Sequence, residues 1–398
     1  MINTGSENRF IPVYLFSFCV YGVIAPYFPI MVRNLGYSPV WIGILFGVYE
    51  GSGIAGPFAF GFWADRKGKY RFPLIISCVL PALATIPLVL LVHPVISAVL
   101  MALMAFGLKS TVSLMDAVTT IQIGQTGNYG KIRVWTTLGF VLTILFLQWT
   151  PVIKPLNAFN VAFWITIFSV VAIGPISLLP GSFLRSNPEL NNASLKRHPA
   201  TGNGQMKLDF SFISLYFVIG FIIIFFSRFS MAAIYTFFPL YMTEIIQWNA
   251  VGLMFAIASI TEIPFMFFSA SLIRRFGPLP LLAVSVLAVC ARLVILAVFP
   301  YKPFIIAAQL LHSLCFGIFH PAAISFISGV FPPEKRGMGM SVYLSLGVGL
   351  PALLGNIAGG AITEVFGYRF LFAIYAAIAG TAAFLYWVLR SRLTTHGK

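Results

Sequence analysis

The sequence predicts an all-α polytopic membrane protein with twelve transmembrane helices in two six-helix bundles. Of its 398 residues, 59% are hydrophobic and only 9% are charged, and the mean hydropathy is +0.94. A soluble domain has about 25% charged residues. The apolar runs are continuous over roughly 20 residues, which is the length a helix needs to cross a bilayer. A β-barrel would alternate apolar and polar residues over roughly 10-residue segments.

Apolar runs and the breaks between them give the expected order of the spans. The predicted spans are 9–32, 39–63, 73–92, 95–120, 132–150, 157–180, 210–242, 248–272, 279–299, 303–330, 338–362 and 367–390. A polar segment at 181–209 separates the first six from the last six. We therefore expect an N-terminal bundle at 1–180, a cytoplasmic linker at 181–209 and a C-terminal bundle at 210–398.

The two halves resemble each other. AFGFWADRKG ends at Gly68 and FSASLIRRFG ends at Gly277, 209 positions later. VWTTLGF contains Gly139 and VYLSLGV contains Gly347, 208 positions later. This near-constant offset indicates an internal duplication, and transporters built from repeats place their substrate site near the bilayer midplane.

The basic residues predict the orientation. The net charge is +15, which in a membrane protein reflects topology rather than nucleic-acid binding, because cytoplasmic loops collect Lys and Arg. With both termini cytoplasmic, 17 basic residues fall in inner loops and ends. Four fall in outer loops, namely Arg33, Lys154, Lys302 and Arg369. We therefore expect a multi-pass protein of the inner or plasma membrane with both termini in the cytoplasm.

Several motifs are excluded by their context. The four cysteines lie in apolar runs without CxxC spacing, so we expect neither a disulfide nor a metal. Gly51, Gly53 and Gly56 form a GxGxxG inside an apolar span, which is not a dinucleotide site. His312 and His320 are eight residues apart, so on a regular α-helix they lie about 80° apart on adjoining faces and share no metal. We expect no cofactor and no catalytic residue, since GxSxG and HExxH are absent and a membrane-embedded enzyme is disfavoured.

Charged residues inside spans mark candidate functional positions, because they are costly in a bilayer and form pathways, relays or ion pairs. The basic ones are Lys109, Arg133, Arg228 and Arg292, and the acidic ones are Glu50, Asp116 and Glu262. Glu262, Arg292 and His312 lie on consecutive spans, which predicts a buried proton and ion-pair network with Arg292 as a candidate partner of Glu262. The alternative for each is a purely structural ion pair or hydrogen bond.

The loop GFWADRKGKYR at 61–71 suggests a family. Gly61 and Gly68 allow tight turns at helix ends, and Asp65 can cap a helix or pair with a cation. The pattern resembles the loop 2–3 signature of the major facilitator superfamily, which implies that Gly61, Asp65, Arg66 and Gly68 help to form an inner gate. Twelve spans, two repeats and a central linker agree with that family.

Two further motifs resemble the phenylpropionate-permease and lactose-permease-like branch of this superfamily. They are YGKIRVWTTLGF with Arg133 and QLLHSLCFGIFH with His312 and His320. The resemblance implies a substrate-binding role for Arg133. Lactose permease has a glutamate one turn after the histidine, where this chain has Cys315. The proton carrier therefore remains open among Glu262, Asp116 and Glu50.

These observations predict a secondary active transporter, namely a proton-coupled symporter of an organic acid or sugar-like solute that works by alternating access. We assign proton coupling to Glu262, His312, Arg292 and Asp116. We assign substrate binding to Arg133, Arg228, Lys109, His320 and Glu50. The excess of cations over acids in the spans favours an organic anion. A proton-driven exporter and a uniporter of the same fold are the alternatives. The expected partners are a small molecule, protons and the bilayer, without nucleic acid, and a monomer suffices.

Overall fold

The computed structural model describes residues 7–123, 129–184, 214–332 and 335–393, and these ranges contain helices and no β-strand. Most of the predicted linker at 181–209 lies outside the described residues. Contacts divide the chain into two compact units. The first consists of Met1–Ile24 and Ser52–Asp209, and the second of Ala25–Gly51 and Phe210–Lys398. The bundle boundaries taken from the sequence stay a prediction, and the contacts add Ala25–Gly51 to the second unit.

The described residues include nine helices that are long and apolar enough to cross a membrane, or ten if the bent pair Val251–Phe265 and Phe267–Phe276 is one span. One of the nine is the 57-residue segment Arg336–Arg392. It contains a break at Gly367, where φ is +79°, and covers the last two predicted spans. The helix α2 (Pro39–Lys67) is not among the nine, although it is 29 residues long. With these divisions the described helices match the twelve predicted spans.

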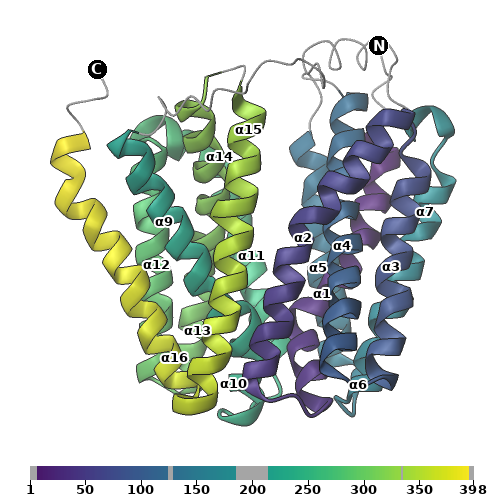
Figure 1. Ribbon diagram of the computed structural model, residues 1–398, viewed down its shortest axis with the longest axis horizontal. Helices are drawn as coiled ribbons and strands as arrows, with labels where there is room; N and C mark the ends of the chain where they lie inside the picture. The colour runs from purple at the N-terminus through teal and green to yellow at the C-terminus, as the bar shows by residue number, and fades with distance from the viewer. Residues whose placement is uncertain (1–6, 124–128, 185–213, 333–334, 394–398) are drawn as a thin grey trace. The chain divides into compact units, whose positions relative to one another are not determined.

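The first unit is a bundle of long helices (Figure 1). Its elements are η1 (Glu7–Phe10), the start of α1 (Ile11–Asn34), the end of α2, α3 (Arg71–Leu90), α4 (Pro94–Ile123), α5 (Tyr129–Trp149), η2 (Pro151–Ile153), α6 (Ala158–Val171), α7 (Ile173–Leu178) and η3 (Gly181–Leu184). α3 packs against α4 and α6. Asn157 caps α6 by accepting a hydrogen bond from the Asn160 backbone N–H at 2.8 Å. At one end the unit has an apolar core that includes Phe60, Tyr70, Leu74 and Leu114.

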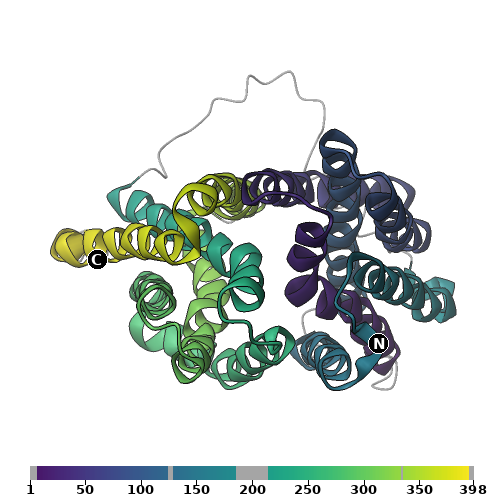
Figure 2. The ribbon, with the colours of Figure 1, turned by 90° about the horizontal axis from the view of Figure 1, so that it is seen from below.

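The second unit is likewise a bundle of helices (Figure 2), and some of its segments are π-helical. Its elements are the end of α1, the start of α2, α9 (Leu215–Ala232), η4 (Ala233–Phe237), α10 (Phe238–Glu244), α11 (Val251–Phe276), α12 (Pro278–Val298), α13 (Lys302–Leu310), η5 (Ser313–Ile318), α14 (Phe319–Val330), α15 (Arg336–Val342), η7 (Tyr343–Gly349) and α16 (Leu350–Leu393). η4, η5 and η7 are π-helical. α16 packs against α9 and α12, and α11 packs against η5.

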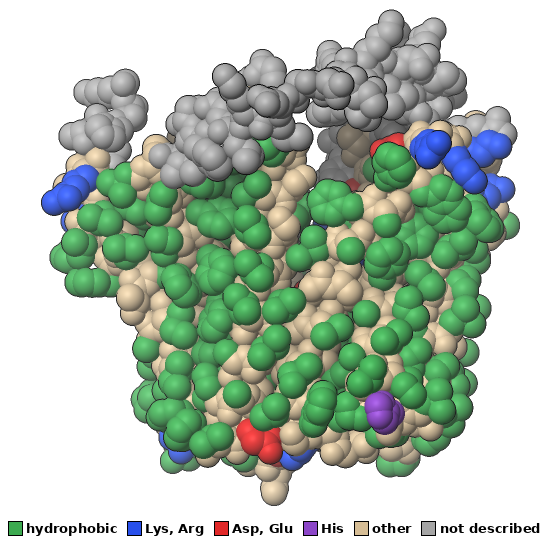
Figure 3. Space-filling model, in the orientation of Figure 1, with side chains coloured by type: hydrophobic (Ala, Val, Ile, Leu, Met, Phe, Trp, Pro, Cys, Tyr) green, Lys and Arg blue, Asp and Glu red, His purple; other side chains and the backbone are tan. Residues whose placement is uncertain are grey.

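The sides of the helices carry a hydrophobic surface, while charged side chains gather towards the helix ends (Figure 3). Exposed apolar side chains such as Phe62, Phe72, Leu178 and Phe267 are each more than 60% exposed. Large contiguous apolar surfaces are unusual on soluble proteins. This surface suits a chain whose helices face lipid.

The repeated loops share a backbone feature. Gly68 has φ +59° and Gly277 has φ +80°. Glycine adopts this left-handed region without the Cβ clash that other residues have, so each repeat turns between its second and third spans at a glycine. The expectation that Gly61 also makes a turn at a helix end is wrong, because Gly61 lies inside α2.

Gly139 brings α5 close to α1 in the first unit. A Cβ added at Gly139 would lie 2.2 Å from the backbone oxygen of Leu15. Such a contact is impossible without a backbone shift, because a helix backbone cannot rotate away as a side chain can.

We predict that Gly139→Val destabilises the protein by about 1–3 kcal/mol or more, as overpacking of a close contact does. Thermal unfolding of the purified protein in detergent measures the change. Gly61→Ala is the matched control, because an added Cβ there meets nothing within 4 Å and alanine favours helix by about 1 kcal/mol. Equal unfolding temperatures for Gly139→Val and the parent would contradict the close contact of α1 and α5.

Candidate functional site

A buried polar chain crosses three spans of the second unit. Glu262 on α11 lies with Oε1 2.6 Å from Nε2 of His312. The other ring nitrogen, Nδ1, is 2.7 Å from Nη1 of Arg292 on α12. Arg292 also donates through Nη2 to Oε1 of Gln309 on α13. Arg292 was expected to pair with Glu262 directly, but the structure places His312 between them.

The chemistry of the donors fixes the protons in this chain. Arginine is a hydrogen-bond donor without acceptor capacity. Nδ1 of His312 must therefore carry a lone pair to accept from Arg292, and the single ring proton sits on Nε2. That proton is donated to Glu262, whose Oε1 is the acceptor. His312 is consequently neutral in this arrangement.

Burial gives these contacts their strength. Arg292 is 1% exposed, His312 8% and Glu262 9%. Hydrogen bonds to charged groups strengthen in a low-dielectric interior, and leaving such a group without a partner is correspondingly costly. The three residues therefore depend on one another, and a change in the proton count of one must alter the others.

His312 also belongs to an aromatic ladder, which consists of the rings of His312, Phe316 and His320. The rings of His312 and Phe316 are nearly parallel with centroids 5.9 Å apart, and those of Phe316 and His320 are nearly parallel at 6.2 Å. His320 Nδ1 lies 3.2 Å from the hydroxyl of Tyr343. The expectation that the two histidines lie on adjoining faces assumed a regular α-helix, whereas Ser313–Ile318, the segment η5 between them, is π-helical.

Arg228 on α9 lies beside this ladder. Its guanidinium carbon is 4.3 Å from the ring centroid of Phe319 and 5.3 Å from that of Phe316. Its side chain is buried, with 9% of the residue exposed. Nε and Nη2 of Arg228 make no hydrogen bond with the described residues.

The first unit holds a second polar cluster. Arg133 on α5 donates through Nη1 to Oδ2 of Asp116 on α4 at 2.5 Å. Tyr14 on α1 donates to Oδ1 of the same carboxylate at 3.0 Å and lies 3.1 Å from Oγ1 of Thr119. Asp116 was assigned to proton coupling and Arg133 to substrate binding, so the structure joins one residue from each group in an ion pair.

The other predicted substrate residues lie elsewhere. The side chain of Lys109 on α4 packs near Gly53, where an added Cβ would be 2.9 Å from the lysine Cγ. Glu50 is half-buried on the part of α2 that belongs to the second unit. Both residues have further interactions.

The predicted inner-gate loop is tied to the end of the sixth span. Tyr70 donates its hydroxyl proton to Oδ1 of Asp65, and its backbone N–H donates to the Leu184 oxygen at 2.9 Å. Burial, together with the Asp65 carboxylate, raises the pKa of Tyr70 above its ordinary range. Arg71 donates to the Leu179 oxygen. Arg66 is exposed at the end of α2.

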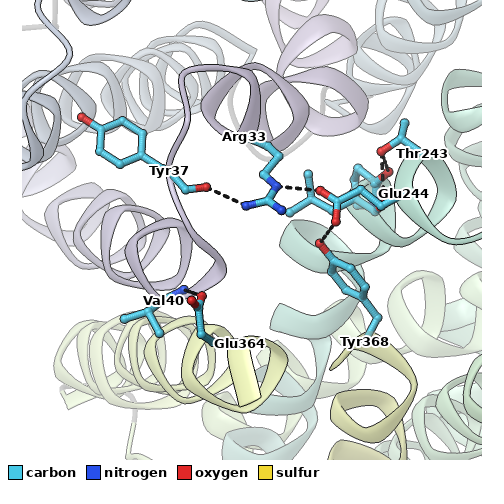
Figure 4. A network of polar contacts seen from close by, with 9 residues as sticks. Arg33, Tyr37, Val40, Thr243, Glu244, Glu364 and Tyr368 are labelled. Carbon is cyan, nitrogen blue, oxygen red and sulfur yellow. Dashed lines mark hydrogen bonds and ion pairs between the residues drawn. The ribbon is translucent and has the colours of Figure 1, made fainter. Parts of the chain in front are cut away.

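A polar network at the other end of α1 was missed by sequence reasoning (Figure 4). Nε of Arg33 donates to Oε1 of Glu244 at 2.7 Å, and Tyr368 donates to Oε2 of Glu244 at 2.9 Å. The backbone N–H of Val40 donates to Glu364 at 3.2 Å. Arg33 was counted only as a loop cation. The available signal was that the similar segments YFPIMVRN and FFPLYMTE carry opposite charges close to their ends, because Arg33 is the second-to-last residue of the first and Glu244 is the last residue of the second.

We predict that Asp116→Ala and Arg133→Ala are strongly non-additive, because each removes the partner of the other. A double-mutant cycle on stability should give a coupling of about 0.5–3 kcal/mol, as for residues in direct contact. Reversible denaturant unfolding of the four proteins in detergent measures it. Asp116→Ala with Arg33→Ala is the control cycle and should be additive. A coupling of zero in the first cycle would rule out the Asp116–Arg133 pair.

Comparison with known proteins gives consistent matches. The model of the MFS_1-like family matches residues 9–374. The maltose permease of Geobacillus stearothermophilus is 26% identical over 390 residues, covering 95% of this chain and 94% of the permease. The probable 3-phenylpropionic acid transporter of Escherichia coli K12 is 22% identical over 379 residues, covering 94% of this chain and 95% of that one.

Two solved structures share the fold. The nucleoside transporter NupG superposes with a TM-score of 0.75 at 14% identity, covering 97% of this chain and 99% of NupG. The xylose transporter XylE from E. coli, in a partially occluded inward-open conformation, superposes with a TM-score of 0.67 at 13% identity, covering 96% and 99%. At these identities the likeness concerns the fold alone.

Proposed function

The chain belongs to the MFS_1-like family and is a membrane transporter of the major facilitator type, and we propose that it is a proton-coupled symporter of a small organic solute. The predicted family and fold class are confirmed. The chain is a transporter rather than an enzyme, because its family and its relatives are permeases. The names of the relatives include both maltose and 3-phenylpropionic acid, so substrate class has to be argued from the site.

The observation that carries the proposal is the Glu262–His312–Arg292 chain. A proton can enter it on the Glu262 carboxylate, which removes the negative charge that His312 Nε2–H faces. A proton can also enter on Nδ1 of His312, but only if Arg292 releases that nitrogen. The first event changes the partner of the His312 ring, and the second changes a partner of the buried Arg292 guanidinium.

Such a change supplies what coupling requires. A ligand shifts a conformational equilibrium only through different affinity for the two states. A carboxylate that is charged in one state and neutral in the other provides that difference for a proton. We therefore assign proton coupling to Glu262, His312 and Arg292, and treat Asp116 with Arg133 as an ion pair of the first unit.

The network of Arg33, Glu244 and Tyr368 supports a gating role. It binds the end of α1 to α10 and α16 within the second unit. α1 and α2 each belong to the first unit over the rest of their length. Alternating access needs contacts that form in one state and break in the other, and we propose that this network is one of them. Gly61, Asp65, Arg66 and Gly68 remain the proposed inner gate.

The membrane placement completes the proposal. The excess of basic residues in the loops on one side of the spans supports cytoplasmic termini and the inner membrane. The substrate-binding roles of Arg133, Arg228, Lys109, His320 and Glu50 rest on their place within spans, and a monomer contains both halves.

We predict that Glu262→Gln abolishes uphill accumulation but keeps solute exchange. The amide oxygen can still accept from His312 Nε2, so the fold survives, but the side chain no longer binds a proton. The measurement is the pH of a lightly buffered medium that contains energy-depleted cells, to which aromatic acids, sugars and nucleosides are added in turn. The external pH should rise when the transported compound is added to cells with the wild type, and it should stay constant in cells with the variant. Counterflow of the same labelled compound should continue.

Glu364→Gln is the matched control, because it replaces a carboxylate outside the buried chain and keeps an oxygen for Val40. It should alkalinise the medium as the wild type does. Undiminished accumulation by Glu262→Gln would exclude this residue as the proton carrier. Uptake of a labelled compound by the wild type without any change in external pH would indicate a uniporter. Neither labelled uptake nor a pH change with any compound would favour an exporter.

We predict that Arg33→Gln increases the population of the state in which the end of α1 has separated from α10 and α16. Loss of a partly exposed ion pair costs about 0.5–1 kcal/mol, which corresponds to a population shift of about two- to fivefold. Ile42 is 0% exposed, so Ile42→Cys reports the opening by its labelling rate with a membrane-impermeant maleimide. Lys154→Gln in the same reporter background is the control. An unchanged labelling rate with Arg33→Gln would exclude the gating role.

A further inference from the structure

The polar cluster of the second unit has buried donors without acceptors. Among its described residues, the buried side-chain nitrogens without a hydrogen bond are Nε and Nη2 of Arg228, Nε of Arg292 and Nε2 of Gln309. Every one of these atoms is an N–H donor, since arginine and the amide nitrogen do not accept. Buried polar groups in folded proteins are rarely left without a partner. The group that completes this cluster must therefore be an acceptor.

The charge of the cluster gives the sign of that acceptor. The charged groups that act on His312 are Glu262, Arg292 and Arg228. The same three act on Tyr235, in the neighbouring segment η4. His312 is neutral, so two guanidinium groups oppose one carboxylate and the cluster carries an excess of one positive charge. A buried charge without a counter-charge is strongly unfavourable, and a monoanion would remove the imbalance.

Arg292 and Arg228 differ in their hydrogen-bond partners. Arg292 donates to His312 and to Gln309. Arg228 contacts the faces of Phe316 and Phe319 but makes no hydrogen bond through Nε or Nη2 with the residues that the structure describes. Nε and one Nη form the edge of the guanidinium fork that matches a carboxylate with two parallel hydrogen bonds. Arg228 is thus the arginine whose Nε and Nη2 can donate two parallel hydrogen bonds to a carboxylate.

The surroundings of Arg228 define the rest of the ligand. Phe316 and Phe319 flank the guanidinium, and Phe316 continues into the stack with His312 and His320. Aromatic faces favour an apolar or aromatic body next to the anionic group. A sugar would offer hydroxyl oxygens to the donors but would leave the excess charge in place.

We propose that Arg228 binds the carboxylate of the transported solute, and that this solute is a small monocarboxylate with an apolar body. The inference rests on the proposed transport function and specifies its substrate class. Phosphate is disfavoured, because it has no apolar body to place against the faces of Phe316 and Phe319.

Equilibrium binding tests this without a proton gradient. Purified protein in detergent is titrated by calorimetry with 3-phenylpropionate, benzoate, propionate, 3-phenylpropionamide, inorganic phosphate and maltose at constant ionic strength. An aromatic carboxylate should bind and raise the unfolding temperature. The amide, which has the same shape without the charge, should bind at least about tenfold more weakly, since a hydrogen bond to a charged group is lost.

Arg228→Met is the decisive variant, and Arg292→Met is its matched control. Arg228→Met should weaken carboxylate binding by about tenfold to a hundredfold. Without ligand it should unfold at the same temperature as the wild type or higher, because it removes an uncompensated buried charge. Arg292→Met should unfold at a lower temperature, because it leaves His312 and Gln309 without their donor. Arg228→Lys keeps the charge but loses the fork, and should bind with intermediate affinity.

Three results would overturn the proposal. They are unchanged carboxylate affinity in Arg228→Met, destabilisation by Arg228→Met as large as by Arg292→Met, and binding of maltose or the amide but of none of the carboxylates. Failure of proton coupling looks different. Carboxylate binding that depends on Arg228, together with undiminished accumulation by Glu262→Gln, would leave this site standing and remove the proposed proton carrier.

Discussion

The position of His312 between a carboxylate and a guanidinium constrains the whole second unit. Arg292 can only donate, so the imidazole must accept at Nδ1 and donate at Nε2. This leaves one protonation state compatible with both contacts. Three helices, α11, α12 and α13, are thereby joined through a single ring, and a proton that enters the chain must change at least one of these contacts.

The Glu262–His312–Arg292 chain also explains why the binding of a proton and the binding of an anion would favour each other. With Glu262 ionised, the cluster has an excess of one positive charge, and protonation of Glu262 raises that excess to two. An anion at Arg228 lowers both values by one, so protonation then creates less unbalanced charge. Coupling of this kind is reciprocal, and the proton therefore favours the anion to the same degree. The direction of this coupling is that of symport.

Sequence reasoning reached the spans and the members of the buried chain but not its connections. Continuous apolar runs predict helices because lipid requires internally satisfied backbones, and charges within them identified Glu262 and Arg292. The spacing of residues could not show that His312 separates the two. Nor could it find Glu244, because an acid near a predicted span end is ordinary until its partner, Arg33, is known. Gly61 was misjudged because helix α2 continues beyond the apolar run that predicted it.

The π-helical segments were not expected from the sequence, and they lie next to residues of the polar cluster in the second unit. η5 begins directly after His312, η7 begins at Tyr343 and η4 contains Tyr235, whereas η1, η2 and η3 of the first unit are 3₁₀-helical. A π turn shifts the backbone hydrogen bonds and is frequently found at functional sites. In η5 the Leu314 oxygen accepts from the Ser285 hydroxyl at 2.8 Å, so a side chain of α12 holds the irregular turn. The helical segment that carries His312 thus contains, within one turn of the imidazole, a π-helical stretch for which the α-helical hydrogen-bond pattern is a second regular arrangement.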